Sequence, residues 1–195
     1  MDRKSIKEKR IKGYFVEAAK KVINEEGVDG LTVKKVANLA GYAPGTLYNY
    51  FTDLNGLLFN CVVEFFSECE ELSLKELEKC KTAKEKVINL SIVYSKYFID
   101  NPNIYQLLFL EDLGEQPEEF KGEEGYIPEV VRLSQKNLME CAEQGIIKRK
   151  DIDIIQALIA NSVQGNLLFY IKERSQMTKE EVLKKIEREV KYLLD

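Results

Sequence analysis

The sequence predicts an all-α protein. Apolar residues recur every three to four positions along much of its 195 residues, which is the period of an amphipathic helix. Two segments, Thr82–Glu85 and Thr178–Glu181, have the Thr-x-x-Glu spacing of a capping box, in which two side chains bond backbone N–H groups at a helix start. The dipeptide Asn101-Pro102 and the residue Gly145 stand where helices are expected to end. These signals together predict a chain of helices joined by short turns.

Residues 32–51 predict two short helices joined by a tight turn. Thr32 carries a hydroxyl suited to cap the first helix, and Gly41 supplies the left-handed conformation that ends it. Pro44 fits the first turn of the second helix, which we expect to carry Thr46 to Phe51. This arrangement is a helix-turn-helix, whose second helix is sized to enter a DNA major groove.

The same stretch resembles the DNA-binding signature of TetR/AcrR-type transcriptional regulators. The residues that carry the resemblance are Thr32, Ala40-Gly41, Gly45-Thr46-Leu47-Tyr48 and Tyr50-Phe51. The resemblance implies a three-helix DNA-binding domain over residues 1–52 and a helical effector-binding and dimerisation bundle over residues 53–195. It also implies a repressor that a small molecule releases from its operator. Ala43 and Leu54 depart from the pattern, because the family usually has a capping Ser or Thr at the first position and often a phosphate-contacting Lys at the second.

DNA contacts are predicted on both helices of this motif. Hydroxyl groups and lysines suit phosphates, whereas the exposed start and middle of the second helix suit the groove, where Asn49 is the best candidate to read a base edge. The predicted residues are Thr32, Lys34, Lys35, Ala43, Pro44, Gly45, Thr46, Tyr48 and Asn49. In an alternative interpretation the aromatic residues Tyr48, Tyr50 and Phe51 pack the small core, and for Phe51 we favour that alternative.

The charge is distributed unevenly along the chain. The formal net charge is -4, but residues 1–60 hold 10 Lys and Arg against 7 Asp and Glu, and residues 61–195 hold 19 against 26. The basic excess therefore falls in the segment that contains the helix-turn-helix, as binding to DNA phosphates requires. We expect double-stranded DNA to be one partner of this chain.

Aromatic residues are frequent after position 53, where a long helix is expected to run to about Lys81 and to connect the two domains. Most aromatics of a helical bundle are simply core, but together they can line an apolar cavity. The predicted ligand-binding residues are Phe66, Tyr94, Tyr97, Phe98, Tyr105, Phe109 and Phe169. Basic residues are scarce among them, which favours an apolar or amphipathic small-molecule effector without strong negative charge.

The last two predicted helices, 151–173 and the one beginning at Thr178, carry more apolar residues than one buried face needs. Surplus apolar faces favour burial against a second copy of the chain. The predicted homodimer residues are Ile155, Leu158, Ile159, Ser162, Val182, Ile186 and Val190. The alternative is a thick core within one chain.

Other classes of protein are disfavoured. The chain has no histidine, and its 4 cysteines form no C-x-x-C pair, so we expect neither a metal nor another cofactor. No phosphate loop or nucleophile elbow suggests an enzyme. We find no signal peptide or long uncharged apolar run, so we expect a soluble, cytoplasmic protein that does not enter membranes. A helical ligand-sensing or interaction protein that no longer binds specific DNA remains the alternative, and Ala43 and Leu54 would permit it.

Overall fold

The computed structural model describes residues 3–115, 117–120 and 126–195, and these residues form helices and turns without a strand. The α-helices are α1 (Arg3–Glu26), α2 (Val33–Ala40), α3 (Leu54–Leu77), α4 (Ala83–Asp100), α5 (Pro102–Phe109), α6 (Glu129–Glu143), α7 (Ile152–Ile171) and α8 (Lys179–Leu193). Short 3₁₀ turns are η1 (Val28–Gly30), η2 (Pro44–Asn49), η3 (Glu118–Phe120) and η4 (Arg149–Asp151). The all-α prediction is confirmed.

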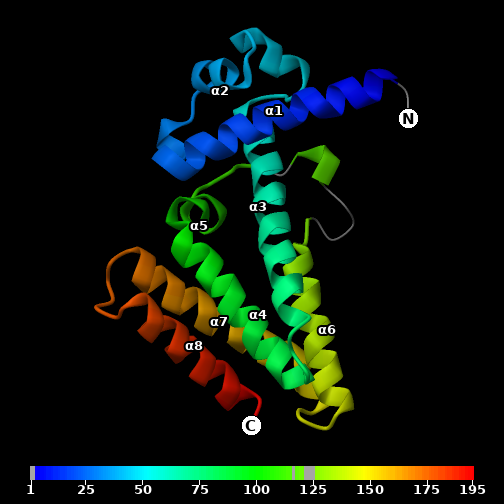
Figure 1. Cartoon of the computed structure of the whole chain (residues 1–195), viewed down its shortest axis with the longest axis vertical. Coiled ribbons are helices and arrows are strands. Elements are labelled where there is room, and N and C mark those ends of the chain that lie inside the picture. Colours follow the sequence, from blue (N-terminus) through cyan, green and yellow to red (C-terminus); the bar gives the residue numbers. More distant parts are fainter. Residues whose placement is uncertain (1–2, 116, 121–125) are drawn as a thin grey trace. The chain divides into compact units, whose positions relative to one another are not determined.

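The chain divides into two compact units (Figure 1). The first unit combines described residues of 1–65 with described residues of 103–126, and the second combines 66–102 with 127–195. The boundary between residues 65 and 66 falls inside α3, so this helix contributes its first half to one unit and its second half to the other.

The core of the first unit forms around the apolar face of α1. Phe15 is fully buried, and its ring meets the edge of the Phe51 ring with centroids 6.2 Å apart. Leu47 of η2 is also fully buried. The burial of Leu47 and Phe51 fixes η2 on the α1 face, because a tight apolar core of this kind loses several kcal/mol when a large side chain is removed, roughly 2–5 kcal/mol for Leu→Ala. Phe51 is therefore a core residue, as expected.

The second unit is organised around α4, which contacts α6, α7 and α8. Phe98, Leu138, Leu167 and Ile186, one from each of these four helices, are fully buried. Both predicted capping boxes are present: Thr82 accepts a hydrogen bond from the Glu85 backbone N–H at 3.1 Å, and Thr178 and Glu181 bond in the same way. Figure 1 shows α7 and α8 side by side, in orange and red.

Helix α3 ends at Leu77, four residues earlier than expected. The backbone N–H groups of Lys79 and Cys80 bond to carbonyls three residues back, at 3.2 and 3.1 Å, so the helix tightens into a turn there. Thr82, the cap of α4, follows directly. The capping box needs an extended residue at Thr82, which leaves too little chain for another turn of α3.

Candidate functional site

The helix-turn-helix has the predicted start and turn. The Thr32 hydroxyl accepts a hydrogen bond from the Lys35 backbone N–H at 3.2 Å. Gly41 has a φ of 80°, and the Tyr42 N–H donates to the Ala37 carbonyl at 2.9 Å, which closes the end of α2. Pro44 opens the next element. These local features are confirmed.

The second helix differs from the expected one, because Pro44–Asn49 forms a short 3₁₀ helix and ends before Tyr50. Ala43 precedes it and provides no side-chain hydrogen bond to its first N–H groups. The ring of Pro44 also removes one donor, so the segment is closed by tighter bonds such as Thr46 N–H to Ala43 O at 2.9 Å. The missing cap at Ala43 is thus visible in the geometry.

The predicted DNA-binding residues lie mostly on the surface of the first unit. Tyr48 is 57% exposed, whereas Leu47 beside it is fully buried. The exposed residues of the set are Thr32, Lys34, Ala43, Pro44, Gly45, Tyr48 and Asn49, and the half-buried ones are Lys35 and Thr46. The alternative that Tyr48 belongs to the core is therefore wrong, and its ring and hydroxyl are available to a partner.

The two lysines of α2 differ in their surroundings. The Lys35 ammonium bonds to the Glu26 carboxylate at 2.6 Å, which links α2 to the end of α1. Lys34 is exposed, and no carboxylate in the described part of the chain forms an ion pair with it. Lys34 is thus a free surface charge, and Lys35 is partly neutralised.

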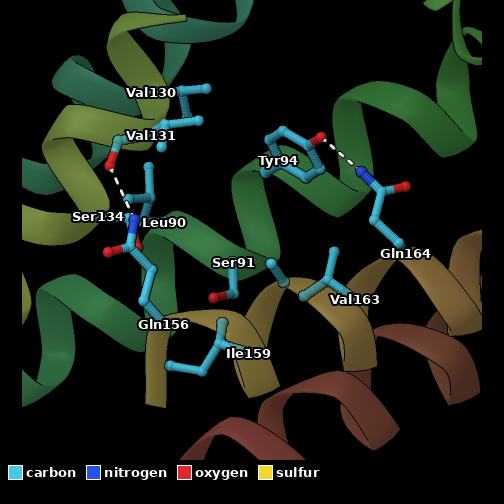
Figure 2. A pocket seen from close by; sticks show the side chains of 11 residues that line it. Leu90, Ser91, Tyr94, Val130, Val131, Ser134, Gln156, Ile159, Val163 and Gln164 are labelled. Carbon is cyan, nitrogen blue, oxygen red and sulfur yellow. Dashed lines mark hydrogen bonds between the residues drawn. The ribbon is translucent and has the colours of Figure 1, made fainter. Parts of the chain in front are cut away.

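A cavity of about 130 Å³ lies in the second unit among α4, α6 and α7 (Figure 2). Apolar side chains dominate its lining, and the polar ones are uncharged. The lining residues are Leu90, Ser91, Tyr94, Val130, Val131, Ser134, Gln156, Ile159, Ala160, Val163 and Gln164. Leu90, Ile159 and Val163 are buried, whereas Val131 and Ala160 are exposed, so the cavity opens to solvent on the side of these two residues. Its chemistry suits an uncharged, apolar group.

Two hydrogen bonds from α7 bracket this cavity, and Figure 2 shows them at opposite ends of the lining set. The Gln164 side-chain amide donates to the Tyr94 hydroxyl of α4 at 2.9 Å. The Gln156 amide donates to the Val131 carbonyl of α6 at 3.4 Å. Eight residues of helix separate the two glutamines, or about 12 Å of helix length. A hydrogen bond between helices therefore lies at each end of the lining set.

Of the seven predicted ligand-binding residues, Tyr94 lines this cavity. Tyr97 and Phe98 are buried in the same unit, and the Tyr97 hydroxyl donates to the Glu68 carboxylate at 2.9 Å. Burial and the Glu68 charge both raise the pKa of Tyr97. The remaining residues do not line this cavity. Phe66 is half-buried on α3, and Phe169 is exposed on α7. Tyr105 and Phe109 lie on α5 in the first unit, with ring centroids 5.0 Å apart and planes tilted by 42°. The aromatics do not form one cluster.

The sequence interpretation missed most of the cavity lining. Leu90, Val130 and Val163 follow helical periodicity like any core residue, so no pattern distinguishes them. Ser91, Ser134, Gln156 and Gln164 were a weak signal, because uncharged polar residues interrupt the apolar stripes of α4, α6 and α7 at positions that face one another.

The exposed side of α7 and α8 carries an open groove of about 690 Å³. Leu158 is 44% exposed, Phe169 55% and Tyr192 81%, and all three line the groove. A polar cluster lies among them: the Glu189 carboxylate accepts hydrogen bonds from Ser162 at 2.6 Å and Asn166 at 2.7 Å. The groove thus combines large exposed apolar side chains with polar groups that are already hydrogen-bonded.

The predicted dimer residues fall into two groups. Val182, Ile186 and Val190 of α8, together with Ile159 of α7, are buried within the chain. They pack the core, because the α8 stripe faces inward, and they offer little area to a partner. Leu158 is exposed, Ile155 and Ser162 are half-buried, and Leu158 and Ser162 line the groove.

The segment Arg149–Ile171, which includes α7, is long and apolar enough to cross a membrane by length and composition alone. Only 17% of the most apolar 18-residue stretch of this segment is buried within the chain. Asn161, Ser162 and Asn166 lie along the groove side of the helix, where hydrocarbon would be a poor solvent for them. This exposed apolar surface is therefore better suited to contact with another protein surface, which can accommodate polar groups, than to contact with hydrocarbon.

Comparison with known proteins points to one group of regulators. The model of bacterial regulatory proteins of the tetR family matches residues 15–61. The "Fatty acid metabolism regulator protein" of Bacillus subtilis (strain 168) is 36% identical over 94 residues, which are 48% of this chain and 47% of that protein. The chain thus matches about half the length of this curated relative.

Solved structures share the fold over nearly the whole chain. The transcriptional regulator FadR from Bacillus subtilis in complex with stearoyl-CoA has a TM-score of 0.71 at 21% identity, covering 93% of this chain and 97% of that one. FadR from Bacillus halodurans reaches 0.70 at 21% identity, with 94% of each chain covered. A putative TetR-family regulator from Rhodococcus sp. reaches 0.70 at 16% identity, covering 95% of this chain and 100% of that one.

Proposed function

Because this chain belongs to the TetR family of bacterial regulatory proteins, we propose that it is a cytoplasmic, DNA-binding transcriptional repressor that an amphipathic small molecule releases from its operator. The observation that carries the proposal is the helix-turn-helix of the first unit, which has a buried inner face and an exposed outer face of hydroxyls, a free lysine and an amide. That outer face has the chemistry of a DNA reader. We retain the division into a DNA-binding domain of residues 1–52 and an effector and dimerisation domain of residues 53–195.

The residues of the outer face are suited to two kinds of DNA contact, with phosphates and with base edges. Exposed Thr32 and Tyr48 and half-buried Thr46 hold phosphates through their hydroxyls, and Lys34 adds charge. Asn49, exposed at the end of η2, reads a base edge, since an Asn amide can pair with adenine in the major groove. The small residues Ala43, Pro44 and Gly45 permit a close approach of η2 to the groove.

The α7–α8 groove supports a homodimer. Leu158, Phe169 and Tyr192 are large apolar side chains that a second copy would cover. The Glu189 carboxylate already accepts two hydrogen bonds at Oε2, and its Oε1 lies 3.8 Å from the Lys185 ammonium, so the chain itself partly compensates this charge before a second copy covers it. A two-fold pair reads two half-sites about one turn, roughly 34 Å, apart, so the operator is an inverted repeat.

The cavity of the second unit supports an effector with an apolar end. Its size of about 130 Å³ is well below the roughly 300–1,000 Å³ of a complete ligand pocket, and near the ~150 Å³ of an apolar cavity that accepts benzene. It therefore holds the end of a molecule, whose polar part stays at the open side near Val131 and Ala160. A fatty acyl compound fits this description if its charged head stays outside the uncharged cavity, and the FadR from Bacillus subtilis was solved with stearoyl-CoA.

The test has two stages. First, DNA fragments retained by the purified protein are selected from a genomic library, and we expect them to share an inverted repeat. Second, fluorescence anisotropy measures the affinity for that repeat with and without saturating stearoyl-CoA, with coenzyme A alone and sodium stearate as controls. A coupling of about 1–3 kcal/mol would weaken DNA binding roughly 5- to 150-fold.

Each stage has its own contrary outcome. Retained fragments without a common sequence would contradict specific DNA binding and favour the alternative of a helical sensor. An operator affinity that stearoyl-CoA leaves unchanged would contradict the fatty acyl effector. Equal release by coenzyme A alone would assign the effect to the nucleotide part of the molecule and not to the cavity.

A further inference from the structure

A series of side-chain contacts leads from the cavity wall to the helix shared by both units. It begins at Tyr94, whose hydroxyl accepts the Gln164 hydrogen bond at one end of the cavity (Figure 2). The Tyr94 ring meets the ring of Phe98, one turn further along α4, with centroids 4.7 Å apart and planes at 66°. A group that enters the cavity beside Tyr94 therefore acts on Phe98 as well.

The ring of Phe98 also contacts the ring of Tyr97, the residue before it on α4. Their ring centroids are 5.1 Å apart with planes at 80°, and Phe98 is fully buried. The Tyr97 hydroxyl then donates to the Glu68 carboxylate of α3 at 2.9 Å. Two residues of one helix thus face different neighbours, since Tyr94 bonds to α7 and Tyr97 bonds to α3.

The hydrogen bond between Tyr97 and Glu68 is a strong one. Burial and the nearby Glu68 charge raise the pKa of Tyr97, so its hydroxyl keeps its proton throughout the physiological range. A neutral donor on a carboxylate forms a charge-assisted hydrogen bond, which is stronger than a bond between neutral groups. Glu68 therefore follows Tyr97 when α4 moves.

We propose that the Tyr97–Glu68 hydrogen bond transmits the state of the cavity to α3. The proposal rests on the effector switch proposed above and names the contact through which that switch acts. Phe98 is fully buried and its ring contacts both Tyr94 and Tyr97, and close-packed interiors transmit strain, so a displacement of Tyr94 reaches Tyr97. Glu68 lies three residues beyond Phe65, where α3 enters the unit that holds the helix-turn-helix.

Tyr97 and Glu68 are positioning residues, since neither lines the cavity nor belongs to the helix-turn-helix. Removing their bond is expected to leave both single affinities in place and to remove the link between them. This result distinguishes a residue that couples the two binding sites from one that only stabilises the fold. A residue that only stabilised the fold would change all affinities together or none.

The experiment compares Tyr97→Phe with wild type. Isothermal titration gives the Kd for stearoyl-CoA, and fluorescence anisotropy gives the operator Kd with and without saturating stearoyl-CoA. In Tyr97→Phe we expect each single Kd to stay within about threefold of wild type, while the ratio of the two operator Kd values falls toward one from the roughly 5- to 150-fold of a working switch. Glu68→Ala should have the same effect. Glu68→Gln keeps an oxygen acceptor and should retain most of the ratio.

Tyr170→Phe is the matched control, because it removes the hydroxyl of a half-buried tyrosine of the same unit outside this series. It should keep the wild-type ratio. A Tyr97→Phe protein with the wild-type ratio overturns the proposed path while the effector switch stands. A wild-type protein whose operator affinity does not respond to stearoyl-CoA overturns the switch and the path together. If Tyr97→Phe fails to fold by circular dichroism, the half-exposed Glu68 variants decide the question in the same assay.

Discussion

Lys34 and Lys35 are consecutive residues of α2, yet among the described residues only Lys35 has an acidic partner, Glu26, at 2.6 Å. Glu26→Gln should release the Lys35 ammonium for a DNA phosphate. We expect tighter operator binding, with a plot of log affinity against log salt that is steeper by about 0.9 per chain, because one more phosphate is neutralised. Lys34→Ala should change the slope by the same amount in the opposite direction and weaken binding to every sequence alike.

The control for this pair is Glu25→Gln, which removes an exposed charge beside the same surface without freeing Lys35. Equal effects of Glu25→Gln and Glu26→Gln on the salt slope would show that only net charge matters. Loss of affinity on one sequence alone in Lys34→Ala would contradict a phosphate contact.

The four cysteines differ in burial and therefore in the expected reactivity of their thiols. Burial raises the pKa of Cys61 and Cys69 to about 12, and it raises the pKa of buried Cys141 as well. Because the thiolate is the reactive form, these three should resist Ellman's reagent at pH 8. Cys80 is half-exposed in the turn that follows α3. We expect one thiol to react rapidly in the native protein and four after denaturation, and rapid reaction in Cys80→Ser would contradict this assignment.

At the scale of elements, the turn after α2 depends on the backbone of Gly41. Its φ of 80° is unfavourable for any residue with a Cβ, although a Cβ there would meet no atom within 4 Å. Gly41→Ala should therefore cost about 1–2 kcal/mol through backbone strain alone. A thermal melt should show Tm lower by about 2–4 °C for each kcal/mol.

Gly13→Ala is the matched control, because Gly13 lies within α1 and a Cβ there also meets open space. Alanine is the better helix former by roughly 0.5–1 kcal/mol, so this variant should melt at a higher temperature. If both variants shift Tm in the same direction, the left-handed turn is not the cause.

The elements were predictable where short-range bonds decide them. The caps at Thr32, Thr82 and Thr178 and the turn at Gly41 each depend on a few neighbouring residues, and all four are present. The 3₁₀ form of η2 was not predicted, because an Ala at position 43 indicates a lost capping hydrogen bond but does not by itself specify the type of helix. The position of η2 was predictable because its start at Pro44 follows directly from the turn at Gly41.

The cavity could not be predicted in the same way. Its wall combines α4, α6 and α7, and its residues differ from core residues only in the space left between them. That space depends on how helices far apart in sequence pack, which periodicity does not encode. The same cause explains the inward face of α8: Val182, Ile186 and Val190 form a clear stripe, but the stripe alone does not tell whether it faces the same chain or a second copy.

At the scale of the whole molecule, the proposed dimer depends on the exposed groove residues. Leu158→Glu should keep the chain folded, since Leu158 is 44% exposed, but it would bury an unpaired charge in the dimer. Sedimentation should then show a folded monomer with weak operator binding. Ile186→Glu, by contrast, places the charge at a fully buried position and should unfold the chain.

Leu72→Glu is the control for Leu158→Glu, because Leu72 is 45% exposed on α3 and does not line the groove. It should sediment like wild type. A Leu158→Glu protein that stays dimeric, or a monomer with undiminished operator affinity, would count against the groove as the dimer face.

The division of the chain between its two compact units affects how the protein can evolve by recombination. The first unit takes in α5 and η3 as well as the amino-terminal helices: Asn103 donates to the Asn24 carbonyl at 3.1 Å, and the Phe120 ring stacks on Phe59 at 6.3 Å. A gene segment that stops at Phe65 would leave out buried Leu107 and its neighbours. The compact unit that contains the helix-turn-helix is therefore built from two separate stretches of sequence, so a recombination event that transferred only the first stretch would lose part of its packing. If the proposed DNA contacts hold, point substitutions at exposed positions such as Asn49 would change the operator preference without disturbing this packing.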